Sequence, residues 1–153
     1  MSAAWQTLTI ADLQAARHAE LVDAVQRKAK AIGQADPIPV AIAKVVAEVR
    51  GVIAFSGRYS VDATTTTIAP NLADLCVQKI SRSLMPRIGR ALTEDEKAEE
   101  KVYQKRLEDL RDGSWPVDEP TTPATDAPVA VRKSRPSIAE RTHNYGPDEQ
   151  EGI

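Results

Sequence analysis

The sequence predicts an all-α protein: a small bundle of about five helices with an extended arm at residues 57–70 and a long, extended C-terminal tail. Two observations support the bundle. Apolar residues recur at helical spacing through most of the first 113 residues, and helix-capping signals bound these stretches. A third observation concerns the core, because aromatic residues make up only 4% of the chain. The core must therefore consist of Ala, Val, Ile and Leu, which suits closely packed helices.

Two helices are expected before residue 34. Thr9 and Asp12 occupy the N-cap and third positions of a start that resembles a capping box, and this helix should run to about Ala16. The second helix carries four apolar residues at helical spacing, namely Val22, Val25, Ala29 and Ile32. Gly33 is a natural end for it.

The next two helices should form the centre of the bundle. Asp36 and Pro37 provide an N-cap and a first-turn proline for a helix over about residues 37–56. Its apolar residues, Val40 and Phe55 among them, spread over more than one face, so it is predicted to be the central helix. The fourth helix, within residues 70–89, presents one apolar face, made of Leu72, Cys76, Ile80 and Leu84. Cys76 is therefore expected to be a core residue.

A fifth helix and a change of composition end the helical region. Thr93 and Glu96 form a capping box, and Gly113 ends this helix, which should be peripheral with a charged outer surface. From Ser114 onward the chain holds six of its ten prolines and is too polar to build a core. We therefore expect a helical domain over residues 1–113 and an extended tail over residues 114–153 that docks on partner subunits.

The predicted arm interrupts the run of helices with four consecutive threonines. Threonine is stiff at χ1 and favours extended backbone, and Pro70 biases the residue before it away from the helical conformation. An extended segment of this kind can pair with another chain. The candidate interface residues of the arm are Arg58, Tyr59, Thr64, Thr65, Thr66 and Thr67.

Two groups of basic residues have alternative interpretations. The first group surrounds the fourth helix and consists of Lys79, Arg82, Arg87 and Arg90. It is either a solvated helix face or a contact for an acidic partner surface or a DNA backbone. The second lies in the tail, where the candidate partner-docking residues are Val131, Arg132, Lys133, Arg135, Arg141 and Tyr145. This patch is either a docking point on an acidic partner or a solubilising stretch.

Several classes of function find no support in the sequence. A net charge of −2 gives no general attraction to nucleic acid or membranes, and no signal peptide or transmembrane segment is expected. The only histidines, His18 and His143, lie in different segments, and Cys76 is the only cysteine. This leaves no metal-ligand spacing and no intrachain disulfide. We also find no phosphate-binding loop or nucleophile elbow, so we predict no enzyme, cofactor or metal site.

The order of elements resembles that of the small helical head–tail connector (adaptor) proteins of tailed bacteriophages, of the Mu-like prophage type. The resemblance covers about residues 7–117 and rests on four short motifs: Ala11-Asp12-Leu13, Gly57-Arg58-Tyr59, Pro70-Asn71-Leu72, and the spaced series Tyr103, Leu107, Leu110 and Gly113. The fourth helix departs from the family pattern, because it lacks the aromatic residues common there.

The resemblance implies a structural virion protein without enzymatic activity. Such proteins form a ring, typically a dodecamer, between the portal and the head-closure or tail-completion protein, and genomic DNA passes through the ring without sequence-specific binding. The implied location is the virion neck, after synthesis in the host cytoplasm. Two alternatives remain open: a head-closure or tail-completion protein one layer lower, and a helical regulator that binds nucleic acid.

Overall fold

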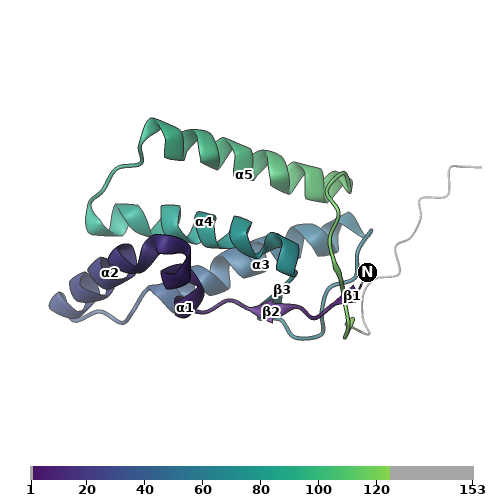
Figure 1. Cartoon of the computed structure of the whole chain (residues 1–153), viewed down its shortest axis with the longest axis horizontal. Coiled ribbons are helices and arrows are strands. Elements are labelled where there is room, and N and C mark those ends of the chain that lie inside the picture. Colours follow the sequence, from purple (N-terminus) through teal and green to yellow (C-terminus); the bar gives the residue numbers. More distant parts are fainter. Residues whose placement is uncertain (1, 125–153) are drawn as a thin grey trace, which may run out of the picture.

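The computed structural model describes residues 2–124, which fold into a mostly helical body with two small sheets (Figure 1). The described part contains four helices of at least 12 residues: α2 (Ala19–Ala31), α3 (Ile38–Ser56), α4 (Ala73–Leu84) and α5 (Glu94–Asp112). The shorter helical turns are α1 (Ile10–Leu13), η1 (Gln14–His18), η2 (Pro70–Leu72) and η3 (Met85–Ile88). The prediction of a helical bundle is confirmed at this level.

The bundle packs around α3. This helix contacts α2, α4 and α5, and its residues Val49 and Ile53 are fully buried. From the facing helices the fully buried side chains include Ile80, Leu84, Tyr103 and Leu110. The central position predicted for this helix is therefore confirmed, and so is the burial of Cys76.

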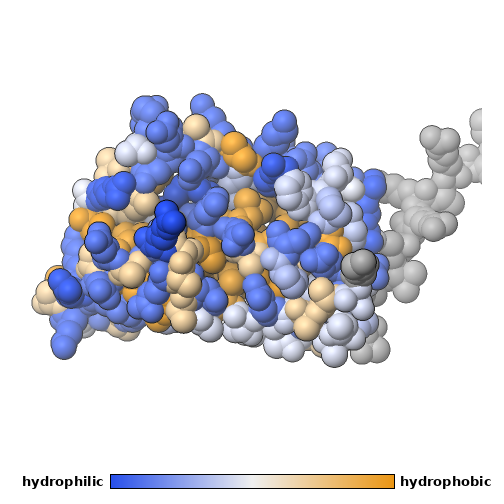
Figure 2. Space-filling model, viewed as in Figure 1, coloured by the Kyte–Doolittle hydropathy of each residue, from blue (hydrophilic) through white to orange (hydrophobic). Residues whose placement is uncertain are grey.

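The apolar residues of α3 lie on more than one face of the helix, as expected, but only one face is buried. Val40 is 66% exposed and Phe55 is 78% exposed, because the neighbouring helices cover only one side of α3. On the opposite edge of the molecule, α5 behaves as predicted. Figure 2 shows mostly hydrophilic side chains along its outer edge, and only Tyr103, Leu107 and Leu110 of this helix are buried.

Helix starts follow the predicted capping chemistry, including the start at Thr9 and Asp12, where the Asp12 carboxylate accepts from the Thr9 amide at 2.6 Å. In the capping box of α5 the Thr93 hydroxyl accepts from the Glu96 amide at 3.3 Å, and the Glu96 carboxylate accepts from the Thr93 amide at 2.8 Å. The first helix was expected to reach about Ala16; α1 passes into η1 after Leu13, and the helical conformation breaks at Ala16 and Arg17. Arg17 then takes a left-handed conformation, with φ of 65°, which kinks the chain between α1 and α2.

Two short ladders that were not predicted connect the N-terminal segment to residues 119–120 and to residues 67–68. Strand β1 (Ser2–Ala3) pairs in parallel with β4 (Glu119–Pro120), and β2 (Gln6–Thr7) pairs antiparallel with β3 (Thr67–Ile68). The expected all-α fold is corrected in this respect. Such contacts join residues far apart in sequence, and local patterns carry no information about them.

The predicted arm at residues 57–70 lies on the body instead of reaching away from it. Its second half enters the core: Ile68 and Ala69 are fully buried, and Thr67 is 7% exposed. The reason is the β2–β3 ladder, which pairs the backbone of this half within the same chain. The longest exposed run of the arm is residues 63–66, and we call its three threonines, Thr64–Thr66, the threonine strip.

The first part of the predicted tail also belongs to the body. We call residues 114–124 the strap. The Trp5 indole donates to the carbonyl of Asp118 at 2.8 Å, and the Asn71 amide donates to the carbonyl of Pro116 at 2.8 Å. Val117 is buried as well. The candidate docking residues of the tail, from Val131 to Tyr145, lie outside the described residues.

Candidate interaction surfaces

A buried carboxylate connects the strap to the segment that carries the threonine strip. Asp62 is 5% exposed, and its carboxylate accepts from the Thr67 hydroxyl at 2.6 Å and from the Thr122 hydroxyl. Around it, the Ala63 amide donates to the carbonyl of Thr122 at 2.8 Å. The hydrogen bonds from Thr122 and Thr67 lower the pKa of Asp62. The carboxylate is therefore ionised at neutral pH although it is buried.

Arg50 extends this contact to α3 and to the N-terminal segment. Its guanidinium donates to the carbonyls of Asp62 at 2.7 Å and Thr67 at 2.8 Å, and lies 5.3 Å from the centroid of the Trp5 ring. We call Arg50, Asp62, Thr67 and Thr122 the Asp62 junction. Thr67 was predicted to be an interface residue, but its hydroxyl is used inside the chain.

Three of the four basic residues predicted around the fourth helix form ion pairs within the chain. Lys79 pairs with Glu100, and Arg82 pairs with Glu99 at 3.1 Å and with Glu100 at 3.3 Å. Arg90, beyond the end of α4, pairs with Glu96 at 3.1 Å. Carboxylates from the first half of α5 thus pair with these three residues within the chain.

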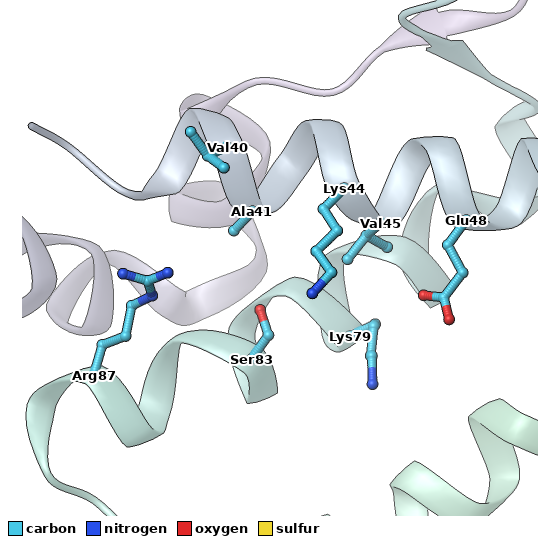
Figure 3. Close-up of a pocket in the computed structure, with 8 residues that line it drawn as sticks. All are labelled: Val40, Ala41, Lys44, Val45, Glu48, Lys79, Ser83 and Arg87. Atoms are coloured by element: carbon cyan, nitrogen blue, oxygen red, sulfur yellow. The ribbon is translucent and has the colours of Figure 1, made fainter.

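The fourth residue, Arg87, lies at a cleft between α3 and α4 that has a volume of about 300 Å³. Figure 3 shows Lys44 pointing into this cleft from α3 and Arg87 reaching toward α3 from η3. Glu48 lines the cleft one turn after Lys44, and its carboxylate accepts from the Tyr103 hydroxyl at 3.0 Å. Among the described residues, Lys44 and Arg87 form no ion pair.

The titratable groups behind this cleft are not poised for proton transfer at neutral pH. Burial, with a contribution from Glu48, raises the pKa of the Cys76 thiol to about 12. Burial and the same carboxylate also raise the pKa of Tyr103. Both groups are therefore neutral near pH 7. A cysteine that acts as a nucleophile must be ionised, so Cys76 is not suited to that role. In residues 2–124, no three His, Cys, Asp or Glu side chains lie where they could hold a metal ion.

A second hollow runs along the other exposed side of α3 and has an apolar lining. This apolar groove has a volume of about 490 Å³ and lies between α3, the segment of residues 7–10 and the threonine strip. None of its lining residues carries a charge: they are Thr7, Leu8, Thr9, Ile10, Pro39, Ile42, Ala43, Val46, Ala47, Thr65 and Thr66. Two of the six candidate arm residues, Thr65 and Thr66, thus form one wall of a preformed apolar surface.

Several residues that build these surfaces were not predicted from local sequence patterns. Arg50 and Asp62 were not singled out as site residues, because their partners lie 12 to 60 residues away in the chain, apart from Thr67, which is five residues from Asp62. The pairing between α4 and α5 did have a signal. A basic helix face is followed, after a short connection, by an acidic helix start, and two such helices pack side by side.

No protein family, curated protein or solved structure matches this chain. As for membranes, no helix in the described part of the chain combines the length and apolar character needed to cross a bilayer.

Proposed function

We propose that this chain is a structural subunit of a bacteriophage neck, a head–tail connector that forms a ring with copies of itself between the portal and the head-closure or tail-completion protein. The order of motifs along the chain supports this proposal. The structural observation that supports it best is the apolar groove, because an uncharged hollow on the surface of a small body is suited to contact with another protein.

The charges of the body also favour a protein that lets DNA pass over one that reads it. Firm contacts between cations and phosphates strengthen binding and add salt dependence. Here Lys79, Arg82 and Arg90 are engaged by carboxylates of α5, so fewer cations remain for phosphates. This supports a channel wall along which genomic DNA slides.

The first alternative, a head-closure or tail-completion protein one layer lower, would use the same surfaces. A head-closure or tail-completion protein also binds neighbours above and below, and the apolar groove would serve it equally. The regulator alternative is less favoured, since a DNA-reading helix needs exposed cations and the exposed face of α5 carries both signs.

The proposal is tested by deleting the gene in the phage genome that encodes this chain. We expect DNA-filled heads and free tails to accumulate, and the purified protein added to the lysate to restore infectious particles. Normal tailed particles in the absence of the gene would contradict the proposal.

The regulator alternative is tested with the exposed cations of the cleft. We expect the isolated wild-type protein to bind duplex DNA weakly and a K44Q/R87Q variant to bind equally weakly, as fluorescence anisotropy would report. Tight binding by the wild type that falls steeply with salt, and is lost in the variant, would favour the regulator. These positions serve better than the full basic group, because Arg82 is 4% exposed and pairs with Glu99 and Glu100, so its replacement also changes stability.

A further inference from the structure

We propose that Phe55 of one copy inserts into the apolar groove of a second copy, so that subunits join head to tail. This inference rests on the proposed function and specifies how the ring forms. Each copy carries both halves of the contact: the projecting side chain of Phe55 and the apolar groove that receives it.

The projecting half is the only phenylalanine of the chain. Phe55 is 78% exposed, more than any other large hydrophobic residue in the described part of the protein. It stands in the last turn of α3, where Gly57 ends the helix in a left-handed conformation with φ of 62°. A rigid helix thus presents the phenyl group of Phe55 to solvent, and little conformational entropy remains to be lost when this side chain is buried.

The receiving half is the groove at the other end of the same helix. Its wall on α3 includes Ala43 and Ala47, two small side chains one helical turn apart, and Ile42 and Val46 add apolar surface. A volume of about 490 Å³ accommodates an aromatic side chain together with part of the helix end that carries it. Because the lining carries no charge, an apolar occupant leaves no buried ion without a partner.

Phe55 cannot occupy the groove of its own chain. From Ala47 to Phe55 the helix rises about 12 Å, at ~1.5 Å per residue, and a straight helix holds the two positions apart. The contact must therefore join two copies through different surfaces. Repetition of such a heterologous contact produces a ring when the rotation closes.

The surroundings of the two halves have complementary charge. At Leu8 the groove adjoins a hollow of about 300 Å³ that Asp12 and Asp74 line. Next to Phe55, Arg58 is exposed and forms no ion pair with a described residue. When Phe55 enters the groove, this cation can approach the acidic hollow, which would fix the orientation of the incoming copy.

Sedimentation equilibrium of the full chain over rising concentrations tests the contact. We expect the wild type to grow beyond a dimer. F55S removes the projecting half, and A47F fills the groove. Each variant should associate at least about 10-fold more weakly than the wild type, since an aromatic side chain loses its burial. V102S is the matched control, because Val102 is also exposed, at 53%, and it should associate as the wild type does.

An equimolar mixture of F55S and A47F gives the decisive result. The A47F copy still has Phe55 and the F55S copy still has an open groove, so the mixture should form dimers that grow no further. Circular dichroism checks that both variants fold, and A43F replaces A47F if the latter does not.

Three outcomes would overturn the contact: wild-type association of F55S, a mixture that stays monomeric, or a wild type that is monomeric at about 1 mM. If these experiments confirm the contact but deletion of the gene still yields normal tailed particles, the proposed function is refuted and the contact stands.

Discussion

Two polar clusters tie the elements of this protein together, and they differ in burial. At the Asp62 junction the carboxylate is 5% exposed, and its direct partners are neutral hydroxyls. Between α4 and α5 only Arg82 is buried, whereas the side chains of Glu99 and Glu100 are 58% and 28% exposed. A buried group that loses a partner has no water to replace it, but an exposed one turns to solvent. A polar contact at the buried Asp62 junction is therefore expected to contribute more to stability than an exposed contact between α4 and α5.

Truncation should reveal the largest difference. A chain that ends after Val117 loses β4, the Thr122 hydroxyl and the carbonyl of Asp118 that accepts from Trp5. We expect the free energy of unfolding to fall by about 3–5 kcal/mol, as the sum of several hydrogen bonds and some apolar burial. Urea denaturation measures it.

A chain that ends after Ala124 is the control, because it keeps every described contact of the strap. Its unfolding free energy should match that of the full chain. Equal stability of the two truncated chains would contradict the role given to the strap.

At the junction itself, D62A should cost about 2–4 kcal/mol. The substitution removes a buried carboxylate that accepts from two hydroxyls, so the link to Thr122 is lost and the Thr67 hydroxyl keeps only the Thr64 carbonyl, at 2.8 Å, as an acceptor. D62N keeps one acceptor oxygen and should cost less than D62A. Chemical denaturation of both variants checks this order, and a cost below about 0.5 kcal/mol for D62A would place the junction among ordinary surface contacts.

The pH dependence of the junction has a definite sign. The pKa of Asp62 is lowered in the folded state, so its ionised form adds stability above the pKa of the unfolded chain, near 4. This stability is lost as the pH falls through the lower folded pKa. We expect the difference in unfolding free energy between the wild type and D62N to be constant from about pH 5 to 7 and to shrink below about pH 4. A difference that grows on acidification would contradict this assignment.

The pairs between α4 and α5 should respond asymmetrically. E99Q/E100Q leaves the buried guanidinium of Arg82 without a carboxylate and should cost about 2–3 kcal/mol. R82M removes the buried charge and leaves two carboxylates that solvent can reach, so it should cost about 1 kcal/mol. Thermal unfolding of both variants at equal pH and salt compares them. A larger loss from R82M would show that packing of the arginine side chain, and not its charge, dominates.

The smallest effect is expected on the outer edge of α5. Lys97 and Glu94 form an ion pair at 2.6 Å, with side chains that are 55% and 88% exposed. Such pairs contribute a few tenths of a kcal/mol, so K97A should change the unfolding free energy by about 0.3 kcal/mol. A loss above about 1 kcal/mol in urea denaturation would remove the contrast between exposed and buried clusters.

Local signals in the sequence predicted the helices well. The capping box at Thr93 and Glu96 and the stop at Gly113 depend on residues a few positions apart, and the structure places the ends of α5 there. The first helical stretch breaks at Ala16 and Arg17, close to its predicted end, although no local rule indicates that Arg17 takes a left-handed conformation.

Non-local contacts explain what the sequence did not predict. Hydrophobic periodicity placed Phe55 on an apolar face of the central helix. Which face of α3 the neighbouring helices bury is decided by their packing, and local sequence does not show it. In the same way, threonines 64 to 67 look alike in sequence, yet the β2–β3 ladder and Asp62 bury Thr67 and leave the threonine strip exposed. The groove depends on such contacts and was not predictable.

Cryo-electron microscopy of intact particles from the phage genome that encodes this chain tests most directly whether the protein acts by assembly. We expect a ring of copies at the junction of head and tail, with Phe55 of each subunit seated in the apolar groove of the next. Particles whose neck contains no copy of this chain would contradict the proposed function.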